Sequence, residues 1–318
     1  YGMSLIFGVT GSTILEEINS SISSGDSSTS IITLGIIFVV IGFAFKVSAF
    51  PFHTWAPDTY EGAPTPVTAF LAVASKAAGF VALMNLVVVG FFGREDVFQP
   101  LLWILAALSM TAGNVMALRQ TNIIRLMAYS GIAQAGFMLA PLAVAGESIE
   151  IADKSVSAIV TYLAIYAAMN LGAFAIILSV ARTTQSGQIE SYNGLFKTSP
   201  ALAIMMTIFL ASLAGVPPLG GWFAKFSVFT SLTSADTSWG YGLAVIAAIN
   251  AVIAFGYYGR IAMKMWVEDP HNSHTSEMKV PVSLSTALAI TVATTLAFGI
   301  VPGIVTHFTD VSLISLAM

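Results

Sequence analysis

Long apolar runs separated by short polar links dominate the chain. A transmembrane helix needs about 20 apolar residues, and each of these runs is long enough to cross a membrane. The pattern predicts eight membrane-spanning helices and requires no strand. The expected helices occupy residues 31–50, 65–92, 99–118, 121–145, 156–181, 200–233, 239–267 and 280–301.

The N-terminal segment has a different pattern. The opening YGMSLIFGV is already apolar and lacks the basic region of a signal peptide, so we expect the chain to begin partway through a helix, as a fragment without its N-terminal spans. Residues 10–30 are rich in Ser, Thr and Gly and contain Glu16, Glu17 and Asp26. We expect an exposed loop there.

Composition restricts the class of protein. Only 9% of the residues are charged, 56% are hydrophobic and the mean hydropathy is +0.85, which indicates an integral membrane protein. Cys is absent, which excludes a thiolate-bound iron–sulfur cluster in this chain, and the formal net charge of -4 is too small to predict nucleic-acid binding. His53 is the only histidine outside the polar loops and the tail, because His271 and His274 lie together in a loop, so no bis-histidine haem is expected. No GxxxxGK[ST] phosphate loop occurs.

The basic residues in the links indicate an orientation. Seven fall on the face reached after every second predicted helix, starting with 31–50, and two fall on the other face. Cytoplasmic loops carry an excess of Lys and Arg, so we expect the first face to be cytoplasmic and residues 10–30 to lie outside. The first face carries Arg119, Arg125, Arg182, Lys197, Arg260, Lys264 and Lys279, and the other carries Arg94 and Lys154.

Three lysines interrupt the apolar runs. Lys46, Lys76 and Lys225 are each the only charged residue in their run. A charge at membrane depth costs about 2.5–3.5 kcal/mol on insertion scales, so it is usually retained for transport chemistry. Removal of an amine from water disfavours its charged form, so three buried lysines can exchange protons and form a relay. The other interpretations are snorkelling to the interface, which suits Lys225 better than Lys76, and a structural ion pair.

Two of the predicted helices are broken by proline and glycine. One run continues from Lys46 into Pro51 and Pro57, and another contains GVPPLGG directly before Lys225. The two breaks are five helices apart, so the broken helices have opposite orientations, as in an inverted repeat whose interrupted helices flank an ion path. Two unrelated proline kinks are the alternative.

A few other polar residues are candidates for the same path. His53 titrates near neutral pH and can pass protons between solvent and Lys46, or it can bond a carbonyl freed by the nearby prolines. Asp58 and Glu61 either face water or pair at the cytoplasmic end, or they guard a proton entry. Three residues of the helix at 121–145 either line a wet path or bond neighbouring helices: Tyr129, Ser130 and Gln134.

Three segments carry a family resemblance. The sequence GFAFKVSAFPFHTWAPDTYEGAPTPVTAFLAVASKAAGF at 42–80 closely resembles the signature of the antiporter-like subunits of proton-pumping NADH:quinone oxidoreductase, respiratory complex I. Its ASKAAG at 74–79 is most similar to subunit N, also called subunit 2. RLMAYSGIAQAGF at 125–137 is similar to the family's RxLAYSSIxHxG helix, and GVPPLGGWFAKF at 215–226 to its second broken helix.

The resemblance implies an all-α, fourteen-helix fold with two inverted five-helix repeats and two discontinuous helices. On that mapping, Lys46 matches the lysine of broken helix seven, Lys76 that of helix eight and Lys225 that of broken helix twelve. The glutamate that pairs with the helix-seven lysine would lie upstream of Tyr1. Residues 1–318 would then form one proton-conducting transmembrane domain, with 1–92 as the end of the first repeat, 99–267 as the second repeat and 280–318 as the C-terminal helix and tail.

Two departures from the family pattern fall in the helix at 121–145. Gly131 replaces the usual second Ser of the motif, and Gln134 stands where many members have His. Because an amide cannot carry a proton, a relay through this helix must use water or bypass Gln134.

The function implied by the resemblance is proton translocation in a redox-driven NADH:quinone oxidoreductase. Protons would move through Lys46, Lys76, Lys225 and water, with His53 as a possible entry. NAD, FMN, iron–sulfur clusters and quinone would reside in partner subunits of the membrane and peripheral arms, with no cofactor or metal in this chain. The expected location is the bacterial inner membrane, or a thylakoid or other energy-transducing membrane. The alternatives are a subunit of a multisubunit sodium/proton antiporter, which the ASK sequence disfavours, and a non-conducting scaffold.

Overall fold

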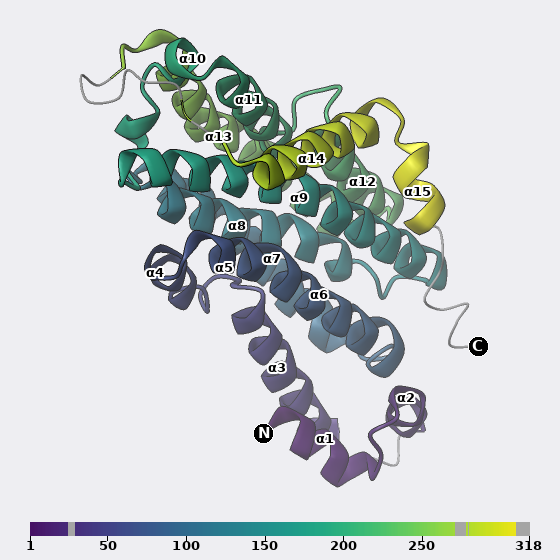
Figure 1. The fold of residues 1–318 in the computed structure, drawn as a ribbon. Coiled ribbons are helices and arrows are strands. Elements are labelled where there is room, and N and C mark those ends of the chain that lie inside the picture. The colour runs from purple at the N-terminus through teal and green to yellow at the C-terminus, as the bar shows by residue number, and fades with distance from the viewer. Residues whose placement is uncertain (25–28, 271–277, 279, 310–318) are drawn as a thin grey trace.

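The protein is all-α over the residues that the computed structural model describes, which are 1–24, 29–270, 278 and 280–309. One isolated antiparallel bridge, between Asn122 and Gln188, is the only strand-like pairing within these ranges. Asp26, His271, His274, Lys279 and the tail from 310 to 318, all used in the sequence predictions, lie outside them. Figure 1 shows the order of the helices.

The helices have the following bounds. In chain order they are α1 (Gly2–Thr10), α2 (Leu15–Ser23), α3 (Thr29–Lys46), α4 (Trp55–Gly62), α5 (Thr65–Phe70), the π-helical turn η1 (Leu71–Ser75), α6 (Lys76–Asn85), the π-helical turn η2 (Leu86–Gly90), α7 (Glu95–Leu118), α8 (Ile123–Leu139), η3 (Ala140–Ala143), α9 (Ile149–Thr184), η4 (Ile189–Tyr192), α10 (Leu195–Thr198), α11 (Pro200–Ala214), α12 (Gly220–Ser234), α13 (Ser238–Val267), α14 (Val282–Ile300) and α15 (Gly303–Thr309).

Six stretches of the described chain are long and apolar enough to span a membrane. They are Thr65–Gly90, Glu95–Leu118, Ile123–Ala143, Ile149–Thr184, Ser238–Val267 and Val282–Ile300. The other two predicted spans contain shorter apolar helices, Ser30–Lys46 and Pro200–Ala214. Both are the first parts of the broken elements α3/α4 and α11/α12, so the predicted interruptions are present.

The first break ends α3 four residues earlier than the apolar run 31–50 predicted. Ser48 adopts a positive φ of 62°, which stops the helix, and Pro51 lacks a backbone donor. The second break follows Gly215, whose φ of 94° ends α11. Side chains satisfy the backbone groups at both breaks: Trp55 donates to the carbonyl of Phe45, and Ser212 accepts from the N–H of Gly221.

The prediction of a loop over residues 10–30 is wrong for Leu15–Ser23, which form α2. The reason is a short apolar stripe in which Leu15, Ile18 and Ile22 recur at helical spacing. Ile18 is buried, and Leu15 packs beside Gly90 of η2. Glu16 and Glu17 occupy the first turn, where negative charge is favourable.

The charged links gather at the two ends of the bundle. At one end, Arg260 donates to the carbonyls of Leu118 and Gln120, and Lys197 pairs with Asp269, whose pKa it holds below the usual range. At the other end, Arg94 pairs with Asp96 and also bonds Thr33, while Lys154 pairs with Glu150. This separation agrees with the predicted grouping of basic residues, and the orientation in a membrane stays a prediction.

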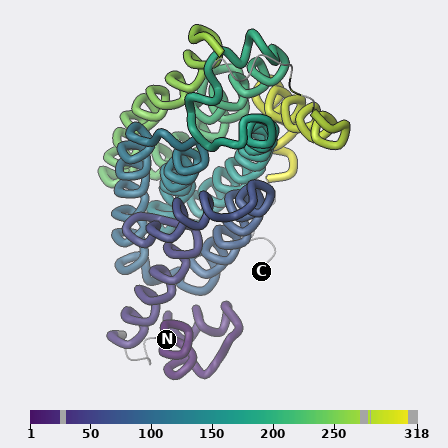
Figure 2. Tube along the Cα trace, turned by 60° about the vertical axis from the view of Figure 1, so that its left-hand side comes forward, coloured from purple at the N-terminus to yellow at the C-terminus, as the bar shows by residue number. Residues whose placement is uncertain are grey.

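The bundle is most enclosed around α8. In the span that contains α8, 89% of the residues in its 18-residue apolar window are buried. The corresponding shares are 33% for α13 and 11% for α14. Figures 1 and 2 show α1 and α2 at one edge and α13 and α14 at the opposite edge, with α8 between them. The side chains that α8 carries therefore lie in the enclosed interior of the bundle, where polar groups need partners.

Candidate functional site

Lys76 is buried in the interior of the bundle. It begins α6 directly after the π-helical turn η1, and only 3% of it is exposed. Its Nζ donates a 2.7 Å hydrogen bond to the carbonyl of Gly131 in the middle of α8. A Cβ at position 131 would lie 3.2 Å from this Nζ and 3.3 Å from the hydroxyl of Tyr166. A side chain at position 131 would therefore press on Lys76 and Tyr166, which would have to move by a few tenths of an ångström.

Lys225 is buried beside the second break, with 4% exposure. Its Nζ donates to the carbonyls of Leu213 and Ala214, at 3.1 and 2.6 Å, and lies 5.0 Å from the centre of the Phe137 ring. These carbonyls are at the C-terminus of α11, where no further helical N–H is available and the partial charge is negative. The chain approaches closely here, since a Cβ on Gly221 would lie 1.8 Å from the Ser212 carbonyl oxygen.

Lys46 differs from the other two lysines. It is the last residue of α3, and the prediction that it is buried is wrong for the described chain, in which it is exposed. Its stem passes close to Gly79, and its Nζ donates a 2.9 Å hydrogen bond to the Oγ of Ser75. The physical reason is that α3 lies near the edge of the bundle, where Phe38 and Phe45 are also exposed.

A buried polar network connects the surroundings of Lys76 and Lys225. Ser130, next to the carbonyl that binds Lys76, is hydrogen-bonded to the Tyr258 hydroxyl. Gln134, one turn further along α8, donates to this hydroxyl at 3.3 Å and to the Leu213 carbonyl at 3.2 Å. The Leu213 carbonyl is also an acceptor of Lys225. The two buried lysines thus lie at opposite ends of a series of polar groups carried mainly by α8.

Sequence analysis missed two members of this network. Tyr162 of α9 donates to the Oε1 of Gln134, and Tyr258 of α13 bonds Ser130 and Gln134. The available signal was a tyrosine within an apolar run, because a buried hydroxyl usually has a hydrogen-bond partner. The finding supports the helix-bonding interpretation of Ser130 and Gln134, whereas Tyr129 is seen in a ring contact with His53.

His53 is buried between the two parts of the first broken helix. Its ring stacks on Phe50 with centroids 5.0 Å apart and lies 6.3 Å from the Tyr129 ring. Its Nδ1 has no hydrogen-bond partner within the described part of the chain. The break itself is fixed by the N–H of Phe50, which donates to Ser109 of α7. A proton-entry role for His53 stays a prediction.

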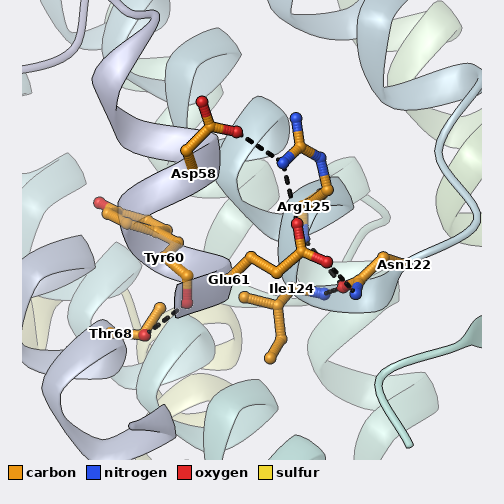
Figure 3. A network of polar contacts seen from close by, with 7 residues as sticks. All are labelled: Asp58, Tyr60, Glu61, Thr68, Asn122, Ile124 and Arg125. Carbon is orange, nitrogen blue, oxygen red and sulfur yellow. Dashed lines mark hydrogen bonds and ion pairs between the residues drawn. The ribbon is translucent and has the colours of Figure 1, made fainter. Parts of the chain in front are cut away.

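Asp58 and Glu61 pair with one arginine at an end of the bundle. Figure 3 shows Arg125 of α8 between the two carboxylates of α4, at 2.7 Å from Asp58 and 2.8 Å from Glu61. Glu61 also accepts from Asn122, which caps α8 by accepting from the N–H of Ile124. The predicted pairing is confirmed, and it attaches α4 to the first turn of α8. The side chains of Asp58 and Glu61 are 76% and 42% exposed.

The residues that the structure describes contain no group of three or more His, Asp or Glu side chains that could hold a metal ion. The site therefore consists of amines, hydroxyls, amides and main-chain carbonyls. Such groups can bind, orient and exchange protons, and lysine is the one among them that changes charge most readily when it is removed from water.

Comparisons with known proteins give the same family as the motifs. Residues 1–253 match the family described as "NADH:quinone oxidoreductase/Mrp antiporter, TM". The chain is 40% identical over 310 residues to an NADH-quinone oxidoreductase subunit N of Trichlorobacter lovleyi, covering 97% of this chain and 62% of that protein. It is 42% identical over 283 residues to an NAD(P)H-quinone oxidoreductase subunit 2 of Crocosphaera subtropica, covering 88% of this chain and 53% of that protein. The chain thus spans less than two thirds of these relatives.

Solved structures share the fold. A chain of respiratory complex I from Thermus thermophilus with bound aureothin superposes with a TM-score of 0.80 at 30% identity, covering 96% of this chain and 64% of that one. A chain of the Mrp complex from Dietzia sp. has a TM-score of 0.85 at 18% identity, covering 97% and 63%, which supports the fold alone. The architecture is thus that of antiporter-like membrane subunits, as the sequence predicted. The chain belongs to the NADH:quinone oxidoreductase/Mrp antiporter transmembrane family.

Proposed function

We propose that this chain is a proton-translocating membrane subunit of a redox-driven NADH:quinone oxidoreductase, in which Lys46, Lys76 and Lys225 exchange the protons. The observation that carries this proposal is the bonding of the two buried lysines. Lys76 and Lys225 donate to main-chain carbonyls, which are neutral acceptors. If either lysine loses its proton, no buried carboxylate is left without a counter-ion. An unpaired buried carboxylate would be strongly destabilising.

The two breaks support the path proposed for the protons. Lys46 ends the first part of one broken helix, and Lys225 binds the free carbonyls of the other. Helix ends inside a membrane are tolerated where protein or water satisfies them, and they often flank ion sites. We assign residues 1–92 to the end of a first inverted repeat, 99–267 to a second repeat and 280–318 to a C-terminal helix and tail, within one domain over 1–318.

Electron transfer belongs to other subunits in this proposal. The chain contains no cysteine, so thiolate-bound iron–sulfur clusters would be held elsewhere, together with NAD, FMN and quinone. The partners would be other membrane-arm subunits and peripheral-arm subunits, and the bilayer would be a bacterial inner membrane or another energy-transducing membrane. The names of the relatives support this assembly.

A subunit of a multisubunit sodium/proton antiporter is the second candidate, because the matched family includes Mrp antiporters and the fold is shared with an Mrp complex. The subunit N relatives favour the first candidate. Mass spectrometry of the proteins that copurify with this chain separates the two. Iron–sulfur and NADH-oxidising partners support the oxidoreductase, and small antiporter subunits without redox proteins would refute it.

Replacement of Lys76 by Met tests proton translocation in the assembled complex. Methionine preserves length and apolar packing but removes the titratable amine, so proton uptake by reconstituted vesicles and the coupled quinone reduction should both fall at least tenfold. The matched control is Lys154→Met, since Lys154 is partly exposed and pairs with Glu150 away from the network. Wild-type proton uptake by an assembled Lys76→Met complex would contradict the proposal, and loss of assembly would favour a scaffold role.

A further inference from the structure

The Gln134 side chain joins four helices. It lies on α8 with 1% exposure. Its Oε1 accepts from Tyr162 of α9, and its Nε2 donates to the Leu213 carbonyl of α11 and to the Tyr258 hydroxyl of α13. Both N–H donors and the carbonyl oxygen are therefore used, which fixes the orientation of the amide.

Gln134 and Lys225 share one acceptor. The Leu213 carbonyl receives Gln134 Nε2 at 3.2 Å and Lys225 Nζ at 3.1 Å. A carbonyl oxygen has two lone pairs, so it can accept from both donors at once. Phe137, three residues further along α8, lies under the same ammonium. The stretch of α8 from 134 to 137 thus forms one wall of the Lys225 site.

An amide in this arrangement can position a carbonyl but cannot pass a proton. Its NH₂ group can only donate hydrogen bonds. To reverse the hydrogen bonds that connect Gln134, Tyr258 and Ser130, the amide would have to rotate and break its bonds with Tyr162 and Leu213. The bond to Leu213 holds the last turn of α11 at the break, where the carbonyl has no helical donor of its own.

We propose that Gln134 is a positioning residue for Lys225: it fixes the Leu213 carbonyl that receives the ammonium, and so it sets how readily Lys225 exchanges its proton while carrying no proton itself. This inference rests on the proposed function, in which Lys225 exchanges protons. The inference gives Gln134 a positioning role in the Lys225 site. Proton transfer along α8 would not require this role.

The charged and titratable groups near this site define the test. Gln134 is contacted by Tyr162 from α9 and Tyr258 from α13, α11 contributes main-chain carbonyls, and α12 contributes Lys225 itself. At Gly220, α14 presents Thr295 and Phe298 to α12.

Gln134→Glu keeps the side-chain shape and introduces a carboxylate beside the Lys225 ammonium. The pH at which proton translocation by the assembled complex is half-maximal should then rise, by about one to three pH units.

Asn250→Asp is the matched control. Asn250 of α13 is also a buried amide, but its bonds go to Thr111 and Asn114 of α7 and not to Lys225. The control introduces the same charge change at a similar depth, so it should leave the pH profile of proton translocation unchanged. An unchanged profile in Gln134→Glu, or an equal shift in both variants, would overturn the inference.

Two more variants keep the test decisive. If Gln134→Glu fails to assemble, Gln134→Met removes all three hydrogen bonds at nearly constant volume, and a pH profile identical to wild type would overturn the positioning role. Lys225→Met tests the proposed function separately. Wild-type proton translocation by Lys225→Met would reject the proposed relay. If Lys225→Met is inactive but the Gln134 variants keep the wild-type pH profile, only the inference on Gln134 is rejected.

Discussion

Lys46 donates a 2.9 Å hydrogen bond to Ser75, and Ser75 directly precedes Lys76 in the chain. Lys46 of α3 therefore contacts the residue that directly precedes Lys76, although the two lysines come from different spans. Ser75 ends the π-helical turn η1, which turns Ser75 toward α3 while Lys76 reaches Gly131 of α8. Such widened turns occur frequently at functional sites. This junction brings the exposed lysine next to the buried one without a direct bond between the two ammonium groups.

Removal of the Ser75 hydroxyl should weaken this junction. In Ser75→Ala, Lys46 loses the acceptor that holds its ammonium beside Lys76, so we expect a severalfold fall in proton uptake by reconstituted vesicles with normal assembly. Ser75→Thr retains the hydroxyl and is the control. Equal activity of the Ala variant and the wild type would show that proton transfer does not use this contact.

The space at Gly131 should also matter. In Gly131→Ala, the added Cβ would lie 3.2 Å from Lys76 Nζ, so the amine or Tyr166 must move by a few tenths of an ångström. We expect slower proton uptake with little change in assembly. The control is Gly42→Ala in α3, because a Cβ at Gly42 meets no atom within 4 Å. A larger loss of activity in the control than in Gly131→Ala would contradict this account.

Lys225→Arg separates charge from proton exchange. Arginine keeps the positive charge and can donate to the carbonyls of Leu213 and Ala214, but it is effectively never deprotonated in a protein. The variant should therefore assemble and translocate protons poorly. Proton uptake is measured in vesicles, with electron transfer measured in parallel in uncoupled membranes. If Lys225 is only an anchor or a snorkelling cation, Arg should function as well as Lys.

Single cysteines can test the predicted orientation, since the sequence has no native Cys. Ser24 and Gln188 are exposed residues beyond the ends of α2 and α9. In right-side-out vesicles, an impermeant thiol reagent should label Ser24→Cys and not Gln188→Cys. Both should react after permeabilisation. The reverse labelling pattern would invert the topology derived from the basic residues.

The ion pairs of Arg125 should contribute unequally to stability. Glu61 is less exposed than Asp58 and also accepts from Asn122, so Glu61→Gln should lower the thermal stability more than Asp58→Asn. Both effects should be at most about 1 kcal/mol, as is usual for partly exposed pairs. Thermal unfolding of the purified complex at low and high salt measures them. The opposite order, or no salt dependence, would contradict the prediction.

The membrane class, the apolar spans, the two breaks and the lysine candidates could all be predicted from the order of residues alone. These features are local, because hydropathy depends on composition over about 20 residues and proline and glycine act on the backbone where they occur. The charge of Lys76 and Lys225 within apolar runs was equally visible. The motif at 42–80 identified the family because it combines the first break with two of the three lysines.

The contacts between these residues depend on how the spans pack in three dimensions. Lys76 bonds a carbonyl 55 positions away, Gln134 bonds Leu213 79 positions away, and Arg125 pairs with Asp58 across 67 positions. A hydropathy pattern states that a helix is apolar but not which neighbour each side faces. The exposure of Lys46 and the convergence of Tyr162 and Tyr258 on Gln134 follow from helix packing, because burial and hydrogen bonding belong to contacts between spans rather than to any one span.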